Sequence, residues 1–593
     1  MRLREMHGEV RYMLRNWKAW DARSFGFCLV RLPALVLQPI VTALIPKVLL
    51  DGIYSRVSIG RMTAAVALLS CLLALTIWMD PFMKELIRGS ARIIRMRYAV
   101  GAFRQTMRLP YAQLESLAGR QRRARAEAFY NARFSAGADF LEVCCDISVC
   151  AVGTLASCAL LYRVSFWMIA LVLLTCAGEF FLLRGLGRRQ EEATGAFARF
   201  SQQLDYFYAL SKNGAAAKEI KIYGFSAYCI RALAAVLAKA EGAVAAYLRV
   251  SAAASGTRAL LNLVRQSVAY LYLVYLTAQN ALSVSDFLFY FGVLTGFSNW
   301  TVRLVSSYAR LERCCMDCAA YRAYVQEDAP QPKPAAEAGA VDSIAFSHVT
   351  FAYPGADAPA VRDLSFTVRA GENIAIVGEN GAGKTTVVKL LCGLYAPNDG
   401  AVLVNGVRCR HDEDRFDLFS VVFQESSFLP MTLAENLSAE SGWEEDRLFA
   451  ALEQAGVADK VRALPAGLQT RLRRDVYPDA VDFSGGEKQK LLLAKAIYKD
   501  APVLVLDEPT AALDPISENE LYLQYRELTR DKISFFISHR LSSTRFCDRI
   551  LFLEDGCILE SGTHEELMAL KGAYYRMYRL QSEAYREAEV RHA

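Results

Sequence analysis

The chain has 593 residues, which is too long for one domain and predicts two to four domains. Hydrophobic residues make up 53% of it and charged residues 22%, which excludes a disordered chain and indicates more apolar surface than a fully soluble enzyme carries. The 15 cysteines follow no framework of spacings, so a disulfide scaffold is also excluded. The formal net charge of +6 is too small to indicate nucleic acid as a partner.

Six apolar stretches occupy the first half of the chain, each near the length of about 20 residues that a membrane-spanning helix needs. We expect these spans at 26–50, 62–83, 142–162, 165–186, 257–279 and 285–307. Short loops join them in pairs, and much longer stretches separate the pairs. Because the N-terminal segment and the long connections are rich in Lys and Arg, the positive-inside tendency predicts that both termini and both long connections are cytoplasmic.

The segments that flank the spans carry predictions of their own. No proline lies between Pro81 and Pro110, so the second span is expected to continue as a helix beyond the membrane. The N-terminal segment lacks the apolar core of a signal peptide and predicts an interfacial amphipathic helix, with Trp17 and Trp20 in the headgroup layer.

After a linker rich in Pro and Ala at 329–342, the composition changes to that of a soluble α/β domain. Residues 378–385 follow an apolar strand, precede a helical stretch and fit G-x-x-x-x-G-K-[ST], the pattern of a loop whose backbone amides hold phosphates. In this pattern Lys384 reaches the β- and γ-phosphates and Thr385 binds Mg²⁺. The predicted ATP-contacting residues of the loop are Gly378, Glu379, Asn380, Gly381, Ala382, Gly383, Lys384, Thr385 and Thr386.

Two carboxylates follow a second apolar strand, at 503–507. We expect Asp507 to bind Mg²⁺ and Glu508 to face the γ-phosphate, where it can polarise the attacking water. An acidic pair between a strand and a loop is often only structural, and it is the phosphate loop that favours a catalytic interpretation.

With these motifs the chain resembles an ATP-binding cassette (ABC) transporter over essentially its whole length, and specifically a half-transporter of the exporter fold. Further motifs follow in the order of that family. The resemblance implies that Gln424 is the Q-loop residue, which contributes to catalysis and to the Mg²⁺ site, and that Tyr353 stacks on adenine. It also implies a signature sequence at 483–489, a D-loop ending at Asp514 and a catalytic switch histidine at His539.

The resemblance defines the expected architecture. A six-helix transmembrane domain with long cytoplasmic helix extensions (1–328) precedes the linker, an α/β P-loop ATPase domain (343–582) and a tail (583–593). In the family, the signature of one chain faces the ATP held by another, so a second half-transporter is expected, with a homodimer favoured over a heterodimer. The segments 111–116 and 218–225 are candidates for the elements that couple the two domains, and plain helix–helix turns are the alternative.

One motif departs from the family pattern. The common signature is Leu-Ser-Gly-Gly-Gln, whereas this chain has Phe483 followed by Ser484, Gly485, Gly486 and Glu487. The residues that contact the γ-phosphate are retained, and Glu487 adds a negative charge beside them.

The expected function is ATP-driven export, across the cytoplasmic membrane, of a hydrophobic or amphipathic compound, a lipid or a small peptide. The alternative is uptake of a metal-chelating small molecule by the same fold. ATP and Mg²⁺ are the expected cofactors. Ionisable groups inside membrane spans are costly and often functional, so a substrate pathway and structural ion pairing are equal alternatives for them. The candidate pathway residues are Arg31, Glu179, Asn262, Arg265 and Gln266.

Overall fold

The structure is a computed structural model, and it describes residues 3–131, 135–175, 177–178, 200, 203–212, 214–327, 340–408, 413–424, 426–439, 442–508, 525, 529, 532–538 and 541–592. The chain divides into two compact units. The first comprises Met1–Arg104 and Arg122–Glu327, and the second comprises Gln105–Gln121 and Asp328–Ala593. The short segment that precedes Arg122 therefore belongs to the unit formed by the C-terminal half of the chain.

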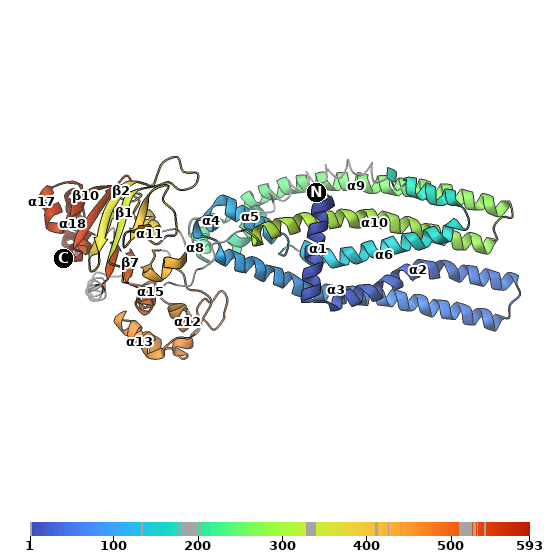
Figure 1. Cartoon of the computed structure of the whole chain (residues 1–593), viewed down its shortest axis with the longest axis horizontal. Coiled ribbons are helices and arrows are strands. Elements are labelled where there is room, and N and C mark those ends of the chain that lie inside the picture. Colours follow the sequence, from blue (N-terminus) through green and yellow to red (C-terminus); the bar gives the residue numbers. More distant parts are fainter. Residues whose placement is uncertain are drawn as a thin grey trace. The chain divides into compact units, whose positions relative to one another are not determined.

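The first unit is helical (Figure 1). Its elements are α1 (Leu3–Trp20), α2 (Arg23–Tyr54), α3 (Ile59–Arg108, which runs into the second unit), α5 (Leu117–Glu127, which begins there), α6 (Ala136–Tyr162), α8 (Gly214–Ile222), α9 (Ser226–Ala278) and α10 (Val284–Val325). Among the described residues, α2, α3 and α6 are long and apolar enough to cross a membrane, and the bent pair α8–α9 makes a fourth candidate. The predicted spans at 257–279 and 285–307 lie in α9 and α10, and that at 165–186 is only partly described.

The extension predicted for the second span is present. α3 has 50 residues and ends at Arg108, two residues before Pro110. At 1.5 Å per residue it is about 75 Å long, well over twice the ~30 Å thickness of the hydrocarbon core. α9 has 53 residues and is similarly long. Both helices therefore have ample length to continue outside the bilayer.

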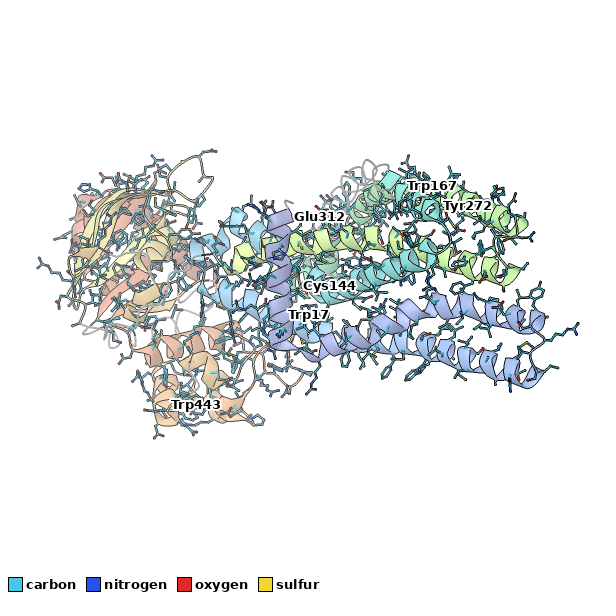
Figure 2. All side chains as sticks on the ribbon, turned by 45° about the vertical axis from the view of Figure 1, so that its right-hand side comes forward. Trp17, Cys144, Trp167, Tyr272, Glu312 and Trp443 are labelled. Atoms are coloured by element: carbon cyan, nitrogen blue, oxygen red, sulfur yellow. The ribbon has the colours of Figure 1, made fainter. Side chains whose placement is uncertain are left out.

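The N-terminal helix packs on protein through its apolar face. Figure 1 shows α1 lying across the long helices, and Figure 2 places Trp17 on it. Trp17 is fully buried, Trp20 packs edge-on against Tyr98 at a centroid distance of 4.8 Å, and Arg322 of α10 donates to Glu9 at 2.8 Å. The amphipathic helix was predicted, but the placement of Trp17 among lipid headgroups was wrong.

Small residues allow close helix packing in this unit. A Cβ atom added to Gly153 of α6 would lie 2.5 Å from the ring of Trp300 on α10. A Cβ on Gly292 of α10 would lie 2.5 Å from the Cβ of Ala43 on α2. Without a hydrophobic driving force in lipid, helices associate through such close packing.

The second unit contains two sheets and a helical part. A six-stranded sheet has the order β10-β9-β3-β8-β7-β6, and a four-stranded antiparallel sheet has the order β2-β1-β4-β5. The strands are β1 (Ser343–Phe351), β2 (Val361–Arg369), β3 (Asn373–Gly378), β4 (Asp399–Val404), β5 (Val407–Arg408), β6 (Phe419–Val422), β7 (Val503–Asp507), β8 (Ile533–Ile537), β9 (Arg549–Glu554) and β10 (Cys557–Gly562). β3 pairs in parallel with β8 and β9, and β7 with β6 and β8.

Two large hydrophobic cores and a third, smaller one lie in the described part of this unit. One large core joins the sheets to α11 (Lys384–Leu391). The other large core joins α12 (Leu433–Ser438), α13 (Glu445–Gln454), α14 (Ala458–Arg462) and α15 (Gly485–Lys499), with Trp443 packed against it (Figure 2). The helices α17 (His564–Leu570) and α18 (Ala573–His592) follow the last strand, and α18 includes residues 583–592 of the predicted tail. The predicted order of a helical domain with long apolar helices followed by an α/β domain is thus present in the described residues, in which three or four of the six predicted spans qualify by length and composition.

Candidate functional site

The phosphate loop joins the end of β3 to the start of α11. Two of its glycines are required by the backbone: Gly378 and Gly383 have φ of 152° and 99°. A Cβ atom on Gly378 would lie 2.2 Å from the carbonyl oxygen of Leu553 on β9, and one on Gly383 would lie 2.7 Å from that of Ala360. The loop is therefore held against neighbouring backbone at both ends.

The loop lysine is placed by the loop itself. The side chain of Lys384 is buried, and its Nζ donates to the carbonyl oxygens of Gly378 at 2.9 Å and Glu379 at 2.8 Å. Burial lowers the pKa of Lys384, and the charges of Glu508 and Asp507 oppose that shift. The ammonium group thus lies at the first turn of α11, where helix amides attract anions.

The two predicted carboxylates occupy the end of β7. Asp507 is buried, and its Oδ2 has no hydrogen-bond partner among the residues that the structure describes. Burial and the neighbouring charge of Glu508 raise the pKa of Asp507 to about 6, against the opposing charge of Lys384. A buried carboxylate oxygen without a hydrogen bond, near a loop that carries the Thr385 hydroxyl, fits Mg²⁺, which prefers oxygen ligands.

Glu508 is held in an uncommon backbone conformation. Its φ is 51°, and its amide donates to the carbonyl of Ile537 on β8 at 2.9 Å. Such left-handed conformations are costly for a residue with a side chain and gather at functional sites. The amide of Gln424, which follows β6, donates to the Glu508 carboxylate at 2.8 Å. The structure therefore brings together two predicted catalytic residues that are 84 positions apart.

The predicted adenine-stacking residue lies in an aromatic cluster. Tyr353 packs edge-on against Phe351 and Tyr395 at centroid distances of 5.0 and 5.3 Å, and its hydroxyl lies 3.2 Å from Oγ1 of Thr386. The cluster follows β1 and adjoins α11, so the predicted adenine-stacking residue and the phosphate loop share the same hydrophobic core.

The cluster also contacts the first candidate coupling segment, which forms the short helix α4 (Tyr111–Glu115). The hydroxyl of Tyr395 donates to the carboxylate of Glu115, and burial, followed by this contact, raises the pKa of Tyr395. Lys389 of α11 lies 3.8 Å from the same carboxylate and 5.8 and 5.4 Å from the ring centroids of Tyr111 and Tyr353. Tyr395 and Lys389 carry no motif, so sequence reasoning missed both.

The signature residues begin α15. Ser484 is the N-cap, and its Oγ accepts from the amide of Glu487, while Glu487 Oε2 accepts from the amide of Ser484 at 2.8 Å. This is a capping box, which satisfies two amides at the helix start. α15 belongs to the helical core, whereas the phosphate loop belongs to the sheet core. His539 and Asp514 lie outside the described residues.

The candidate pathway residues lie in two clusters. Arg31 of α2 is buried, and its Nε donates to Asp80 of α3 at 2.7 Å, with Nη1 3.4 Å from Asp146 of α6. Arg265 of α9 is also buried and donates to Asn262 at 2.8 Å.

Two further residues of the predicted pathway face also lie on α9. Gln266 is half-buried on α9, and Tyr272, also on α9, donates to the Ser165 hydroxyl at 3.1 Å (Tyr272 is labelled in Figure 2). Glu179 lies outside the described residues. The predicted α9 face is therefore largely packed against protein.

Comparisons with known proteins agree with this geometry. Residues 361–511 match the ABC transporter family. The ATP-dependent lipid A-core flippases of Methylobacillus flagellatus and Burkholderia orbicola are each 42% identical to this chain, over 244 and 241 residues. These matches cover 40% of this chain and 41% and 40% of the flippases, so the chain matches about two fifths of the length of these relatives.

The likeness to solved structures extends further. The structure of a bacterial Atm1-family ABC exporter with ATP bound superimposes with a TM-score of 0.79, over 95% of this chain and 98% of that one, at 22% identity. This likeness shows the fold of both halves. The predicted resemblance is confirmed at the level of the fold: a domain that matches the ABC transporter family follows a helical domain, in the arrangement of a solved exporter structure.

Proposed function

We propose that this chain, a half-transporter of the exporter fold with a fused ABC domain, uses ATP to export a lipid or amphipathic compound across the cytoplasmic membrane. The observation that carries the proposal is the contact between Gln424 and Glu508, beside Lys384 and Asp507, in a chain whose apolar helices are long enough to span a bilayer. Both termini and the ABC domain lie in the cytoplasm in this proposal, because the Lys- and Arg-rich connections favour that side.

Each residue has a defined part in hydrolysis. Backbone amides of the loop and Lys384 bind the phosphates, and Tyr353 receives the adenine ring. Asp507, Thr385 and Gln424 would hold Mg²⁺, which neutralises phosphate charge. Glu508 accepts a proton from the attacking water, and the amide of Gln424 orients that carboxylate through the 2.8 Å hydrogen bond. We assign His539 to the γ-phosphate and Asp514 to the contact between two ABC domains.

The working unit is a pair of half-transporters. One chain holds one phosphate loop and one signature, on separate hydrophobic cores. ATP bound to the loop of one chain is then contacted by Ser484, Gly485 and Gly486 of the other. The motifs Lys384, Asp507, Glu508 and the signature are all intact in this chain. We therefore favour a homodimer, and a heterodimer is the alternative.

The substrate is inferred from polar side chains on α10, the helix in which the predicted span 285–307 lies. Asn299, Arg303, Ser306 and Arg310 recur at helical spacing on one face of α10, and the two arginine side chains are 49% and 47% exposed. Charged side chains on such helices face a water-filled cavity rather than lipid tails. This face supports a substrate with an acidic headgroup. The names of the matching flippases are consistent with a lipid.

The burial of the other candidate pathway residues separates structural residues from those that could contact a substrate. Arg31 and Arg265 are buried in polar contacts, so we assign them to the structure of the bundle. Asn262 and Gln266 are half-buried and remain candidates for the pathway, as does Glu179.

The test is transport in liposomes that carry the purified chain. ATP added outside acts only on molecules whose ABC domains face outward, so export moves substrate into the lumen. A panel should include fluorescent lipids with anionic and zwitterionic headgroups and a metal chelate. Glu508→Gln should retain ATP binding and lose 10²–10⁴-fold in hydrolysis, since a general base is removed. Glu554→Gln, at the exposed end of β9, is the matched control.

Three results would contradict the proposal. Near-normal hydrolysis by Glu508→Gln would reject the catalytic assignment. ATP-driven efflux of the chelate from the lumen would favour the uptake alternative. Hydrolysis that appears only when a different half-transporter is co-expressed would replace the homodimer by a heterodimer.

A further inference from the structure

Glu487, the residue that departs from the common signature, forms an ion pair with a residue outside the motif. The ammonium group of Lys460, on α14, lies 3.1 Å from Oε1 of Glu487. The second carboxylate oxygen, Oε2, accepts from the amide of Ser484. Each oxygen of Glu487 thus has its own donor. The Ser484 contact and then the Lys460 contact lower the pKa of Glu487, so the group is ionised at neutral pH.

Helix capping alone does not require this charge. A glutamine at the third position of a helix completes a capping box as well as a glutamate does. The difference between Glu487 and the glutamine of the common signature is therefore a negative charge in the first turn of α15. The first amides of a helix attract anions, and a carboxylate there competes with a phosphate for the same positive end.

The helix that carries Lys460 is held firmly against α15, so the lysine is in position to compensate the charge of Glu487. Its helix, α14, is anchored by the buried side chains of Val461 and Ala458, which belong to the same hydrophobic core as Leu491 of α15. The side chain of Lys490 also donates to the carbonyl of Gly456 at 3.4 Å, which joins α15 to the start of α14. Side-chain packing and this hydrogen bond therefore fix the distance between the two helices, and the Lys460 side chain spans it.

The exposure of the pair argues against a role in stability alone. The side chains of Lys460 and Glu487 are 51% and 28% exposed, and exposed ion pairs contribute little to folding. Their charges can still act on a highly charged ligand that binds nearby.

We propose that Lys460 is a positioning residue of the signature motif, which acts through Glu487. By pairing with that carboxylate it compensates the negative charge at the third position of α15, so that Ser484, Gly485 and Gly486 can receive the γ-phosphate of ATP held by a second copy of the chain. This inference rests on the proposed function, because it requires the signature to contact nucleotide in a dimer.

The test is the ATP dependence of hydrolysis by the full chain in lipid nanodiscs. Lys460→Gln leaves one unpaired carboxylate near the phosphates. At a separation of about 10 Å and a partly screened dielectric this raises the KM for ATP about three- to fivefold in low salt, with little change in kcat. In 0.5 M salt, where the Debye length is about 4 Å, the increase should nearly vanish. Lys460→Arg should restore the wild-type KM.

A double-mutant cycle isolates the pair. Glu487→Gln should have a KM at or below that of wild type. In its background Lys460→Gln should no longer raise the KM. The matched control is Lys532→Gln, because Lys532 pairs with Asp500 at 2.5 Å, at the opposite end of the same helix. It removes the same charge and should leave the KM unchanged.

The outcomes separate this inference from the proposed function. An unchanged KM in Lys460→Gln, or an equal rise in the Glu487→Gln background, would overturn the role of Lys460 while leaving the transporter assignment intact. A second readout is ATP-driven closure of two chains, measured by cross-linking in the Glu508→Gln background. A three- to fivefold higher ATP midpoint for closure after Lys460→Gln supports the inference even if hydrolysis is absent. No closure at any ATP concentration would overturn both.

Discussion

Replacing Arg31 by methionine is the sharpest test of the membrane unit, because it decides between a structural and a substrate-binding role. Arg31 is 2% exposed and contacts Asp80 at 2.7 Å and Asp146 at 3.4 Å. It therefore joins α2 to α3 and α6. Methionine keeps a similar length and apolar stem but removes the charge from between two carboxylates.

The magnitude follows from what the two carboxylates retain. Removing one partner of a buried ion pair costs about 3–5 kcal/mol. Asp80 is 31% exposed, and Asp146 keeps Arg303 and Arg310 at 3.7 Å, so both carboxylates stay partly compensated. We therefore expect a loss of about 3 kcal/mol for Arg31→Met. Replacing both members, as in Arg31→Met with Asp80→Leu, should recover much of it, because an apolar pair of similar volume is often neutral.

The assay is reversible unfolding of the purified chain in mixed micelles, read from the helical unit, together with ATPase stimulation by the transported compound. Arg303→Met is the control for the unfolding measurement alone, since replacing a half-exposed arginine in a secondary contact should cost under about 1 kcal/mol. Arg31→Met should unfold more easily, yet its folded fraction should keep the wild-type ratio of stimulated to basal hydrolysis. Unchanged stability with lost stimulation would refute the structural role and place Arg31 in the pathway.

Three further predictions concern the ABC domain. Lys384→Ala should weaken ATP binding at least tenfold, because a charge-assisted contact with the β- and γ-phosphates is lost; titration with a fluorescent nucleotide measures this, and unchanged affinity would reject the phosphate-loop assignment. Tyr395→Phe keeps the ring but removes the hydrogen bond to Glu115, so hydrogen exchange in α4 should speed up about fivefold, equivalent to about 1 kcal/mol; unaltered exchange would mean that the bond does not hold α4. Burial, aided by the charge of Arg545 and opposed by that of Glu565, lowers the pKa of His564, whose Nδ1 lies 2.8 Å from the Tyr574 hydroxyl. Because the pKa of His564 is lower in the folded state, the unfolded state binds more protons, and α17–α18 should lose stability as the pH falls below about 6.5. His564→Asn should remove this pH dependence, and an identical pH profile of stability in the variant would contradict the prediction.

The ABC domain could be predicted in detail because its chemistry is local in the sequence. Lys384 could be predicted because a glycine-rich loop comes after an apolar strand, and Asp507 because it ends an apolar strand and precedes a second carboxylate. The long-range contact of Gln424 with Glu508 could be expected only through the family resemblance. Tyr395 and Glu115, 280 positions apart, belong to no motif, and their contact follows only from the folded arrangement.

The membrane unit was harder to predict because periodicity reports that a face is apolar and does not report what covers it. α1 has the pattern of an interfacial helix, yet Trp17 is covered by protein. On α9, Arg265 and Asn262 share a predicted face, of which Arg265 is fully buried and Asn262 is half-buried. For Arg31 the ionisable residue was identified, but its partners Asp80 and Asp146 lie 49 and 115 positions away. Several acidic residues could have served, and only packing selects these two.

Glu487 shows why a departure from a motif must be interpreted together with its surroundings. When the motif is considered alone, Glu487 places a carboxylate where the family has the amide of glutamine, and this suggests a weakened ATP site. In the structure one oxygen completes the capping box that the amide would also complete, and the other oxygen pairs with Lys460. The lysine lies 27 positions earlier, on a helix that no motif marks. The ion pair restores the net charge of the common signature, so Glu487 gives no reason to regard this chain as the weaker half of a heterodimer. We therefore expect that charge reversal at Lys460 or at Glu487 alone impairs ATP-driven closure more than charge reversal at both positions.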